Sequence, residues 1–220
     1  MRIHRALIAA MAVAAALPQV GTAQMGRSFK DSWFWGVKGG GMDFNSMTMS
    51  HQQAPLIGGD WLITRSRGGL YVSFTQAFLT DQAAIQLDPA DTSLKIVGLK
   101  NMRRLDAAAM IFPGMALFTR PYAGIGFSIK QINNAMPADL SQYASPDELA
   151  ETMSVITQLR TSASPFFIAG AQFRLPLISI FFQGTASPAN KNGFLYNGKA
   201  FHLTYEAGIR YNVGTSIDRN

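Results

Sequence analysis

Residues 201–214 read FHLTYEAGIRYNVG, and every second side chain belongs to the same chemical class. The odd-numbered row, from Phe201 to Val213, is apolar throughout, whereas the even-numbered row is polar or small. A β-strand turns alternate side chains to opposite faces, so this stretch predicts a strand with one apolar face. At about 3.3 Å per residue it spans roughly 46 Å, which is longer than the usual strand of a soluble domain. The pattern is typical of a strand with lipid outside and a narrow polar lumen inside.

The N-terminal residues have the three parts of a secretory signal peptide. Arg2 and Arg5 precede an apolar core at residues 6–17, and small residues at 21–23 provide a cleavage site before Gln24. The core is shorter than the roughly 20 residues that a membrane-spanning helix needs. We therefore expect residues 1–23 to be removed and residues 24–220 to form one exported domain.

The composition narrows the class of that domain. Only 15% of all residues are charged while 48% are hydrophobic, and the chain has 20 glycines and no cysteine. A soluble domain usually carries about 25% charged residues. Without Arg2 and Arg5 the formal charge is +4, and no basic stretch is interleaved with stacking aromatic residues, so we do not expect nucleic-acid binding. An exported chain of this kind favours an outer-membrane barrel.

Eight strands are expected along the chain. They cover residues 31–44, 55–64, 69–79, 94–112, 116–132, 166–175, 177–184 and 198–214. The connections alternate between short turns and the long segments 45–54, 80–93, 133–164 and 187–197, as they do in barrels with short periplasmic turns and long outer loops. A competing parse runs residues 61–78 as one strand, which leaves seven strands and breaks this alternation.

One helix is expected inside the longest outer loop, over residues 146–160. Ser145 and Glu148 form a capping box with Pro146 at the first helical position. Leu149, Met153, Ile156 and Leu159 then fall on one face. We interpret this helix as a cover for the barrel rim, with an adhesive or lipid-contacting element as the alternative.

With these features, the chain resembles the small eight-stranded outer-membrane barrels of the OmpA-like and opacity-type superfamily. The resemblance rests on the signal peptide, the WFWGV opening at residues 33–37, the loop alternation and the closing strand. It implies an all-β, antiparallel, up-and-down transmembrane barrel. It also implies outer-membrane lipid and the barrel-insertion machinery as partners, with surface ligands reached through the four long loops. The chain departs from the pattern at its end, where residues 214–220 follow Val213 without a terminal aromatic residue.

Two sets of site residues follow from this picture. The first set is expected to project into the lumen and to pair across strands, because a lone buried charge costs several kcal/mol: Lys38, Arg104, Asp106, Lys130, Arg174, Glu206 and Arg210. The second set is expected to anchor the barrel at the membrane interface: Trp33, Trp35, Trp61, Tyr205 and Tyr211. Eight strands leave room only for side chains, so no continuous pore is expected.

Catalytic and metal sites are not expected. His51 and His202 are the only histidines after residue 23 and there is no cysteine, so we do not expect a His/Cys metal site, and no cofactor is predicted. His202 and Thr204 have the spacing of the His-x-Ser motif in the similar barrels of lipid A deacylases, but threonine replaces the nucleophile. We expect a structural role in envelope integrity or an interaction role through the surface loops. A soluble periplasmic lipocalin-like barrel for a hydrophobic ligand and an outer-membrane lipid-modifying hydrolase remain as alternatives. The lipocalin reading requires the apolar row to face inward.

Overall fold

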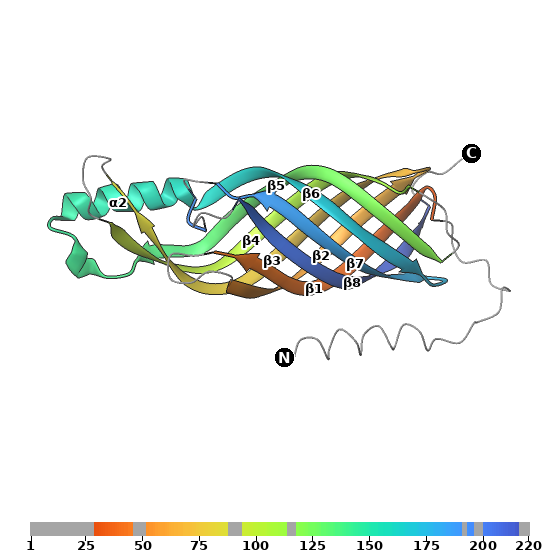
Figure 1. The fold of residues 1–220 in the computed structure, drawn as a ribbon, viewed down its shortest axis with the longest axis horizontal. Coiled ribbons are helices and arrows are strands. Elements are labelled where there is room, and N and C mark those ends of the chain that lie inside the picture. The colour runs from red at the N-terminus through yellow and green to blue at the C-terminus, as the bar shows by residue number, and fades with distance from the viewer. Residues whose placement is uncertain are drawn as a thin grey trace.

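Eight antiparallel strands close into one up-and-down barrel in a computed structural model of the chain (Figure 1). The structure describes residues 29–45, 52–87, 94–113, 118–190, 193–195 and 200–215. The strands are β1 (Ser32–Phe44), β2 (Gln52–Arg65), β3 (Gly68–Ile85), β4 (Lys95–Ile111), β5 (Thr119–Pro137), β6 (Thr161–Arg174), β7 (Ile178–Pro188) and β8 (Phe201–Thr215). Each strand pairs with its neighbours in sequence, and β1 pairs with β8 to close the sheet. The predicted fold class is confirmed.

A tight turn separates β2 from β3, so the seven-strand parse is wrong. Arg65 pairs with Gly68, and Ser66 has a φ of 48° between them. The β6–β7 connection is also short, with the Leu175 N–H donating to the carbonyl of Ile178 at 2.8 Å. Ser32 pairs with Thr215, so β1 begins at the end of the barrel where β8 finishes. The predicted signal peptide at 1–23 and the tail at 216–220 lie outside the described residues.

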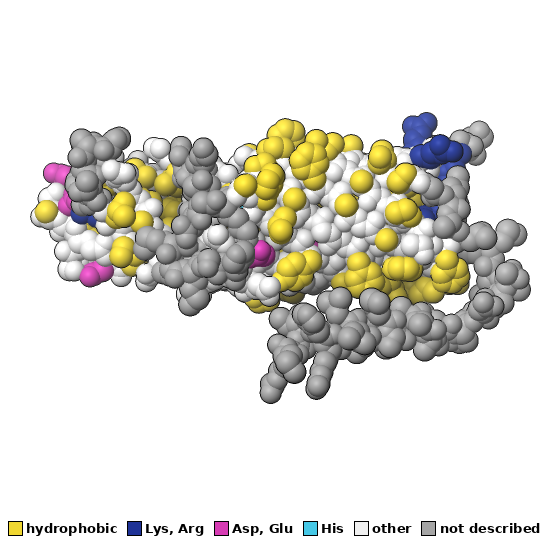
Figure 2. Space-filling view, in the orientation of Figure 1, with side chains coloured by type: hydrophobic (Ala, Val, Ile, Leu, Met, Phe, Trp, Pro, Cys, Tyr) yellow, Lys and Arg dark blue, Asp and Glu magenta, His cyan; other side chains and the backbone are white. Residues whose placement is uncertain are grey.

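The outside of the barrel is apolar over most of its length (Figure 2). In β8 the predicted faces are confirmed, because Leu203, Tyr205 and Ile209 are exposed while Thr204 and Glu206 are buried. The same outward row continues around the sheet in residues such as Val37, Ile57, Phe74, Leu105, Ile125, Phe127, Phe167 and Phe182. The lipocalin alternative loses its premise, because the apolar row faces outward.

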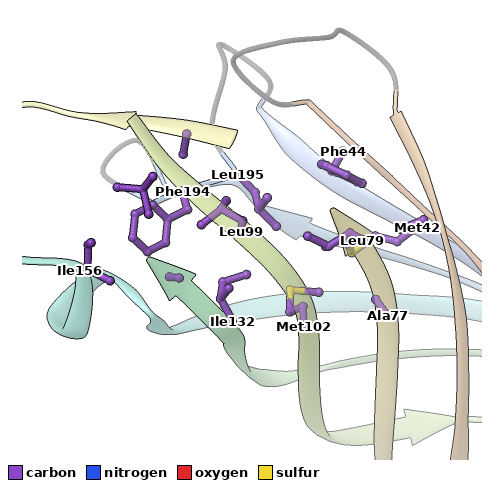
Figure 3. Packing of buried hydrophobic residues seen from close by; sticks show 14 of the residues in the cluster. Met42, Phe44, Ala77, Leu79, Leu99, Met102, Ile132, Ile156, Phe194 and Leu195 are labelled. Carbon is purple, nitrogen blue, oxygen red and sulfur yellow. The ribbon is translucent and has the colours of Figure 1, made fainter. Parts of the chain in front are cut away.

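The interior has three layers rather than a uniformly polar lumen. At the end with the short turns, aromatic and aliphatic side chains fill the barrel: Phe29, Phe34, Leu62, Tyr71, Ala108, Met110, Phe112, Tyr122, Phe166 and Ile168. Charged and polar side chains fill the middle. A second apolar cluster occupies the opposite end and continues beyond the barrel (Figure 3). The expectation of a polar lumen is therefore correct only for the middle layer.

Three strands extend past the barrel at the end opposite the short turns, and this shortens the predicted loops. Residues 80–85 belong to β3 and 133–137 to β5, while residues 161–164 begin β6. Likewise 52–54 begin β2, and 187–188 end β7. At the base of the extension Asn101 has a φ of 57°, next to a register shift between β3 and β4. Parts of three of the four predicted loops, at 46–51, 88–93, 191–192 and 196–197, lie outside the described residues, as does the predicted start of the closing strand at 198–199.

The helix α2 (Pro146–Leu159) packs on this extension, after a short 3-10 helix, η1 (Leu140–Gln142). The predicted cap is confirmed, because the Ser145 hydroxyl accepts from the N–H of Glu148 at 3.2 Å. The predicted contact face is partly wrong: Met153 is exposed, and Thr152 is buried beside Ile156. No helix in the described parts of the chain has the length and apolar character needed to cross a membrane.

We call the extension of β3, β4 and β5, together with η1 and α2, the cap. Its inner side is lined by Leu79, Ala83, Ile85, Val97, Leu99, Ala135 and Ile156, with Val155 and Leu159 packed alongside. The cluster continues into the barrel through residues such as Met42, Leu56 and Ile132. The cap and the barrel therefore share one apolar core.

Candidate functional site

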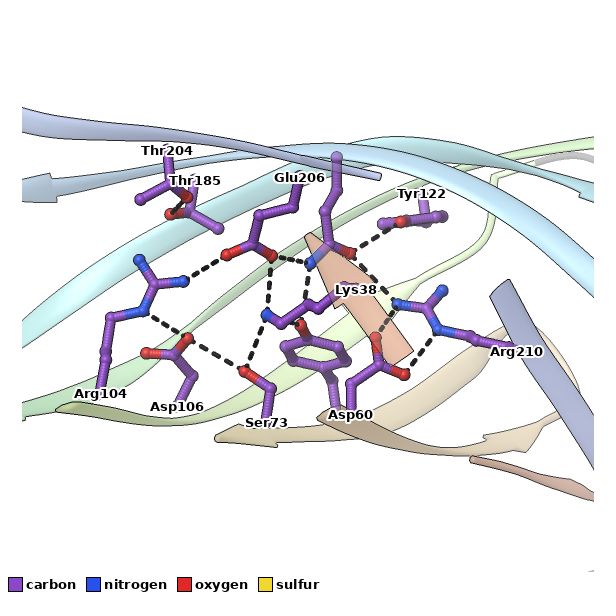
Figure 4. Close-up of polar contacts among 12 residues, drawn as sticks. Lys38, Asp60, Ser73, Arg104, Asp106, Tyr122, Thr185, Thr204, Glu206 and Arg210 are labelled. Atoms are coloured by element: carbon purple, nitrogen blue, oxygen red, sulfur yellow. Dashed lines mark hydrogen bonds and ion pairs between the residues drawn. The ribbon is translucent and has the colours of Figure 1, made fainter. Parts of the chain in front are cut away.

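Glu206 on β8 is the centre of a charge network in the middle layer of the barrel (Figure 4). Its Oε2 accepts from Lys38 Nζ at 2.7 Å, and its Oε1 accepts from Arg104 Nη2 at 2.7 Å. Arg104 Nε also pairs with Asp106 Oδ2 at 2.9 Å. The side chains of Lys38 and Glu206 are fully buried. Four of the residues predicted for the lumen thus meet in one network.

Arg210 lies four residues after Glu206 on the same inward row of β8 and forms the second part of the network. Its Nε and Nη2 donate to the two carboxylate oxygens of Asp60 at 2.9 and 3.1 Å, a bidentate geometry that strengthens the pair. The guanidinium also lies 3.8 Å from the ring centroid of Phe181. Arg210 is completely buried, so Asp60 supplies the charge that a buried cation needs.

Gln183 on β7 joins the two parts. Its Nε2 donates to Glu206 Oε2 at 2.6 Å and to the Tyr71 hydroxyl at 2.8 Å. Its Oε1 accepts from Arg210 Nη2 at 3.2 Å and from the Tyr122 hydroxyl at 2.9 Å. Lys38 completes its own bonds with Tyr71 and Ser73 at 3.0 and 3.2 Å. One amide thus uses both ends to connect a carboxylate-centred cluster to an arginine-centred one.

The network is balanced in charge. Its cations are Lys38, Arg104 and Arg210, and its carboxylates are Asp60, Asp106 and Glu206. Each of these side chains comes from an inward position of its strand, as alternation requires. Gly36 provides the room, since a Cβ there would lie 2.5 Å from Asp60 Oδ1 and 2.8 Å from Arg210 Cγ. The arrangement ties β1, β2, β3, β4, β7 and β8 together across the lumen.

Two predicted lumen residues do not join this network. Lys130 lies nearer the cap, where its Nζ donates to the Ser187 hydroxyl at 2.6 Å. Arg174 is at the last position of β6, at the end with the short turns, and is only partly buried. Both residues follow the inward parity of their strands, but their heights along the barrel separate them from Glu206.

Sequence reasoning missed Asp60, Gln183, Gln172, Tyr71, Ser73 and Tyr122 as members of the network. Asp60 carried a usable signal. It is the sole carboxylate of β2, two residues from Leu62 on the inward row. The predicted lumen set also contains five basic residues and only two acidic ones, so balancing the buried charge requires a further carboxylate. Gln172 and Gln183 gave no comparable signal, because an uncharged amide does not call for a partner of a given charge.

The predicted interfacial aromatics all lie on the outer surface. Trp33 and Trp35 on β1 contact Trp61 on β2, with ring centroids 5.4 and 5.9 Å apart. Tyr205 and Tyr211 on β8 are each 47% exposed. The three tryptophans gather towards the end with the short turns, where such rings would meet lipid headgroups.

The cap is held by one lysine near its tip. Lys95 Nζ is 2.6 Å from Glu148 Oε1 and 2.7 Å from the carbonyl of Gln142, and it lies 5.3 Å from the Tyr143 ring centroid. Gln142 Oε1 in turn accepts from the N–H of Ile96 at 3.0 Å. Asp139 begins η1 by accepting from the Ser141 N–H and hydroxyl, and these bonds hold the pKa of the Asp139 carboxyl below its usual range. These contacts fix η1 and α2 against the β4 edge.

Catalytic chemistry has little support among the described residues. His202 and Thr204 are buried inside the barrel, and Thr204 shares a hydrogen bond of 2.6 Å with the Thr185 hydroxyl. A lipid substrate outside the barrel would not reach them. No cluster of histidine and carboxylate side chains suited to a metal ion occurs in the described parts of the chain.

Comparison with known proteins gives a fold but no family. No protein-family model and no curated protein sequence matches the chain. The crystal structure of Ail, the attachment invasion locus protein of Yersinia pestis, is similar with a TM-score of 0.50 and 12% identity, covering 84% of this chain and 99% of Ail. Neisserial surface protein A is similar with a TM-score of 0.51 and 9% identity, covering 81% of this chain and 96% of that protein.

Both similar proteins are small barrels, and their likeness to this chain extends over nearly their whole length. The agreement therefore covers the closed sheet and not merely a hairpin. Together with the strand order β1 to β8, it shows that the protein has the eight-stranded, antiparallel, up-and-down fold of the small outer-membrane β-barrels.

Proposed function

We propose that the protein is an integral outer-membrane barrel whose closed body anchors an ordered cap for interactions outside the membrane. The observation that carries this proposal is the apolar outer row. On β8 it runs from Leu203 to Val213, which is about 25 Å along the barrel axis at the usual strand tilt. A transmembrane barrel carries an apolar band of about that height. An uninterrupted apolar surface of this size would be a severe aggregation hazard in water.

Two further features support membrane insertion. The tryptophan cluster of Trp33, Trp35 and Trp61 lies at one end of the apolar surface. Towards the cap, on the outer side of β3, β4 and β5, Arg103 Nε and Asn133 Nδ2 donate to Gln76 Oε1 at 3.3 and 3.4 Å. Aromatic rings and polar side chains suit the two borders between hydrocarbon and headgroups. Lipid and the barrel-insertion machinery are the partners that this proposal requires.

The filled interior supports a structural body rather than a channel. A charge-balanced network occupies the middle layer, and an apolar cluster closes each end. Permeation would require breaking buried ion pairs, each of which costs several kcal/mol to disrupt by losing one partner. We therefore propose that the barrel does not conduct and has no catalytic role.

The cap supports an interaction role at the loop end. It presents α2 and the tips of three strands beyond the apolar band, held by Lys95 and by the shared core. Glu151 and Met153 are among the α2 side chains exposed on its outer side. Binding residues are often found on such elements when a rigid scaffold positions them.

Insertion is tested by folding the purified chain into lipid vesicles and comparing gel mobility with and without heating. A heat-dependent shift and resistance of the barrel to protease are expected, together with recovery from cells in the outer-membrane fraction. Recovery as a detergent-free soluble protein would overturn the proposal. The same vesicles, loaded with small solutes, should show no leakage above protein-free vesicles.

The interaction role is tested separately by replacing residues 139–159 with a short Gly/Ser turn. This change removes η1 and α2 but leaves β5 and β6, so the barrel should still insert. Binding to envelope lipids or surface ligands, screened with the intact protein, should be lost in the variant. Equal binding by both proteins would show that the cap helix has no part in recognition.

A further inference from the structure

The end of the barrel with the short turns carries an excess of positive charge. Outside the central network, the charged side chains of the described residues at this end are five cations and one carboxylate: Lys30, Asp31, Arg65, Arg67, Arg120 and Arg174. Figure 2 shows Lys and Arg side chains gathered at this end of the visible face. The protein therefore presents a cationic surface at one of its two membrane borders.

Arg65 and Arg67 are the members of this set that lie where lipid headgroups would be. Both are exposed, at the turn between β2 and β3. Arg65 is on the outward row of β2, two residues after Ile63 and four after Trp61. The Arg67 carbonyl accepts from the N–H of Phe112 at 2.8 Å, which holds the turn against the end of β4. Two guanidinium groups are thus presented side by side in sequence at the edge of the apolar surface.

Arg120 and Arg174 face the mouth of the barrel instead of the outer surface. Arg120 pairs in register with Gln172, which is fully buried, and Arg174 lies two residues further along the same row of β6. The guanidinium of Arg120 lies 4.2 Å from the ring centroid of Phe29. Their charges add to the positive potential at this end without lying on the outer face.

The height of Arg65 matches the headgroup layer. Four residues separate it from Trp61, which is about 10 Å along the barrel axis at the usual strand tilt. Tryptophan rings prefer the border of the hydrocarbon, and the headgroup layer beyond that border is roughly 5–8 Å thick. A long arginine side chain reaches the phosphates of that layer.

The two arginines also have no carboxylate partner. No ion pair among the described residues includes Arg65, Arg67 or Asp31, the one carboxylate at this end outside the network. A guanidinium donates two parallel hydrogen bonds to a phosphate, and the pair is strengthened by charge. A headgroup with a net negative charge would supply the missing counter-charge, whereas a zwitterionic headgroup would bring a cation of its own.

We propose that Arg65 and Arg67 bind the phosphates of anionic phospholipids, those whose headgroup has no amine, in the leaflet at the short-turn end. In barrels of this fold that leaflet faces the periplasm. The inference rests on the proposed function, because it requires an inserted barrel. It adds the class of lipid, the leaflet and the residues that select it.

The experiment uses the tryptophans as local reporters. All three in the chain, Trp33, Trp35 and Trp61, lie in the cluster beside this border. The full chain is folded into vesicles of equal parts phosphatidylglycerol and phosphatidylcholine, with quenching bromine atoms on the acyl chains of one lipid or the other. At low salt the quenching should show about a threefold preference for phosphatidylglycerol, as two exposed ion pairs would give. In about 1 M salt, where the screening length is about 3 Å, the preference should vanish. Equal quenching by the two brominated lipids at low salt would overturn the proposal.

Matched variants assign the preference to the turn. Arg65→Gln and Arg67→Gln should each lower it and together remove it, whereas Lys100→Gln, which removes an exposed cation of β4 in the cap, should keep it in full. A preference that persists in the double variant, or that falls equally in Lys100→Gln, would contradict the proposal. Soluble glycerol phosphate at matched ionic strength should leave the quenching ratio unchanged; its loss would assign the arginines to a soluble phosphate ester instead of a lipid.

Heat-modifiable mobility, recorded on each sample, reports insertion separately. An inserted wild-type barrel without a lipid preference refutes this inference and leaves the proposed function standing. A wild-type chain that fails to insert refutes the proposed function itself.

Discussion

Replacing Glu206 by glutamine should lower the free energy of unfolding by about 3–5 kcal/mol, because it removes the central carboxylate of a buried network. Glu206 Oε2 accepts from Lys38 and Gln183, and Oε1 accepts from Arg104. An amide has one acceptor oxygen, so the glutamine can accept either from Lys38 and Gln183 or from Arg104, but not from both sides. Arg104 retains Asp106, but Lys38 keeps only the Tyr71 and Ser73 hydroxyls.

The loss of stability in Glu206→Gln comes from the charge of Lys38, which is left buried without a carboxylate, and not from the lost hydrogen bond alone. Lys38→Met should therefore cost a similar amount, because it leaves Glu206 with the wrong charge balance. The double variant, Lys38→Met with Glu206→Gln, removes both charges together, so neither is left buried without its partner. We expect the double variant to be more stable than the sum of the single effects predicts, by about 2 kcal/mol or more.

Urea unfolding in vesicles, followed by tryptophan fluorescence, measures these values. Trp33, Trp35 and Trp61 all lie on the outer surface and report the loss of lipid contact. Additive effects, within about 0.5 kcal/mol, would show that Lys38 and Glu206 act independently and would refute the network.

Three further predictions concern the membrane face, the packing and the cap. Ile209→Arg puts a charge on the middle of the outer row and should cost about 2–4 kcal/mol and slow folding into vesicles, whereas Val213→Arg near the strand end should cost about 0–1 kcal/mol; equal effects would contradict the depth assignment. Gly36→Val should destabilise the barrel by about 1–3 kcal/mol through contact with Asp60, while Gly39→Val, whose Cβ would lie 3.7 Å from its nearest neighbour, serves as the control in the same urea assay. Because the hydrogen bonds from Ser141 lower the pKa of the Asp139 carboxyl, the stabilisation of η1 is present above the unfolded pKa and is lost as pH falls through the folded pKa. The NMR shift of the Ser141 amide should therefore titrate with a midpoint below about 3.9, and a midpoint at or above that value would contradict the hydrogen bonds between Asp139 and Ser141.

The strands inside the apolar band could be predicted from the sequence, because lipid on the outside forces a strict alternation. On β8 every outward residue from Leu203 to Val213 is apolar or small, so the period of two is visible without further information. The strand ends could not be predicted in the same way. In residues 80–85 the inward side chains include Ala83 and Ile85, while Thr80 and Gln82 face outward. Beyond the band the outer face meets water, so the polarity of the two rows is reversed and the segment resembles a loop.

The lumen was only partly predictable for a related reason. Charges such as Glu206 and Arg210 are identified because they cannot face lipid. Apolar inward residues such as Leu62 and Phe166 cannot be identified in this way, since an apolar side chain suits either the lipid face or a packed interior. On α2 the contact face includes Thr152, which a search for apolar periodicity passes over in favour of Met153.

The most direct test of the account is a single-cysteine spin-label scan along residues 202–212 of β8, in the full chain folded into lipid vesicles. The native sequence has no cysteine, so each label reports one position without background. Labels at odd positions should be accessible to oxygen dissolved in the bilayer and protected from a water-soluble nickel complex. Labels at even positions should be protected from the nickel complex, because the lumen is filled. Nickel access at the odd row, or along the whole even row, would contradict a closed barrel with its apolar face in lipid.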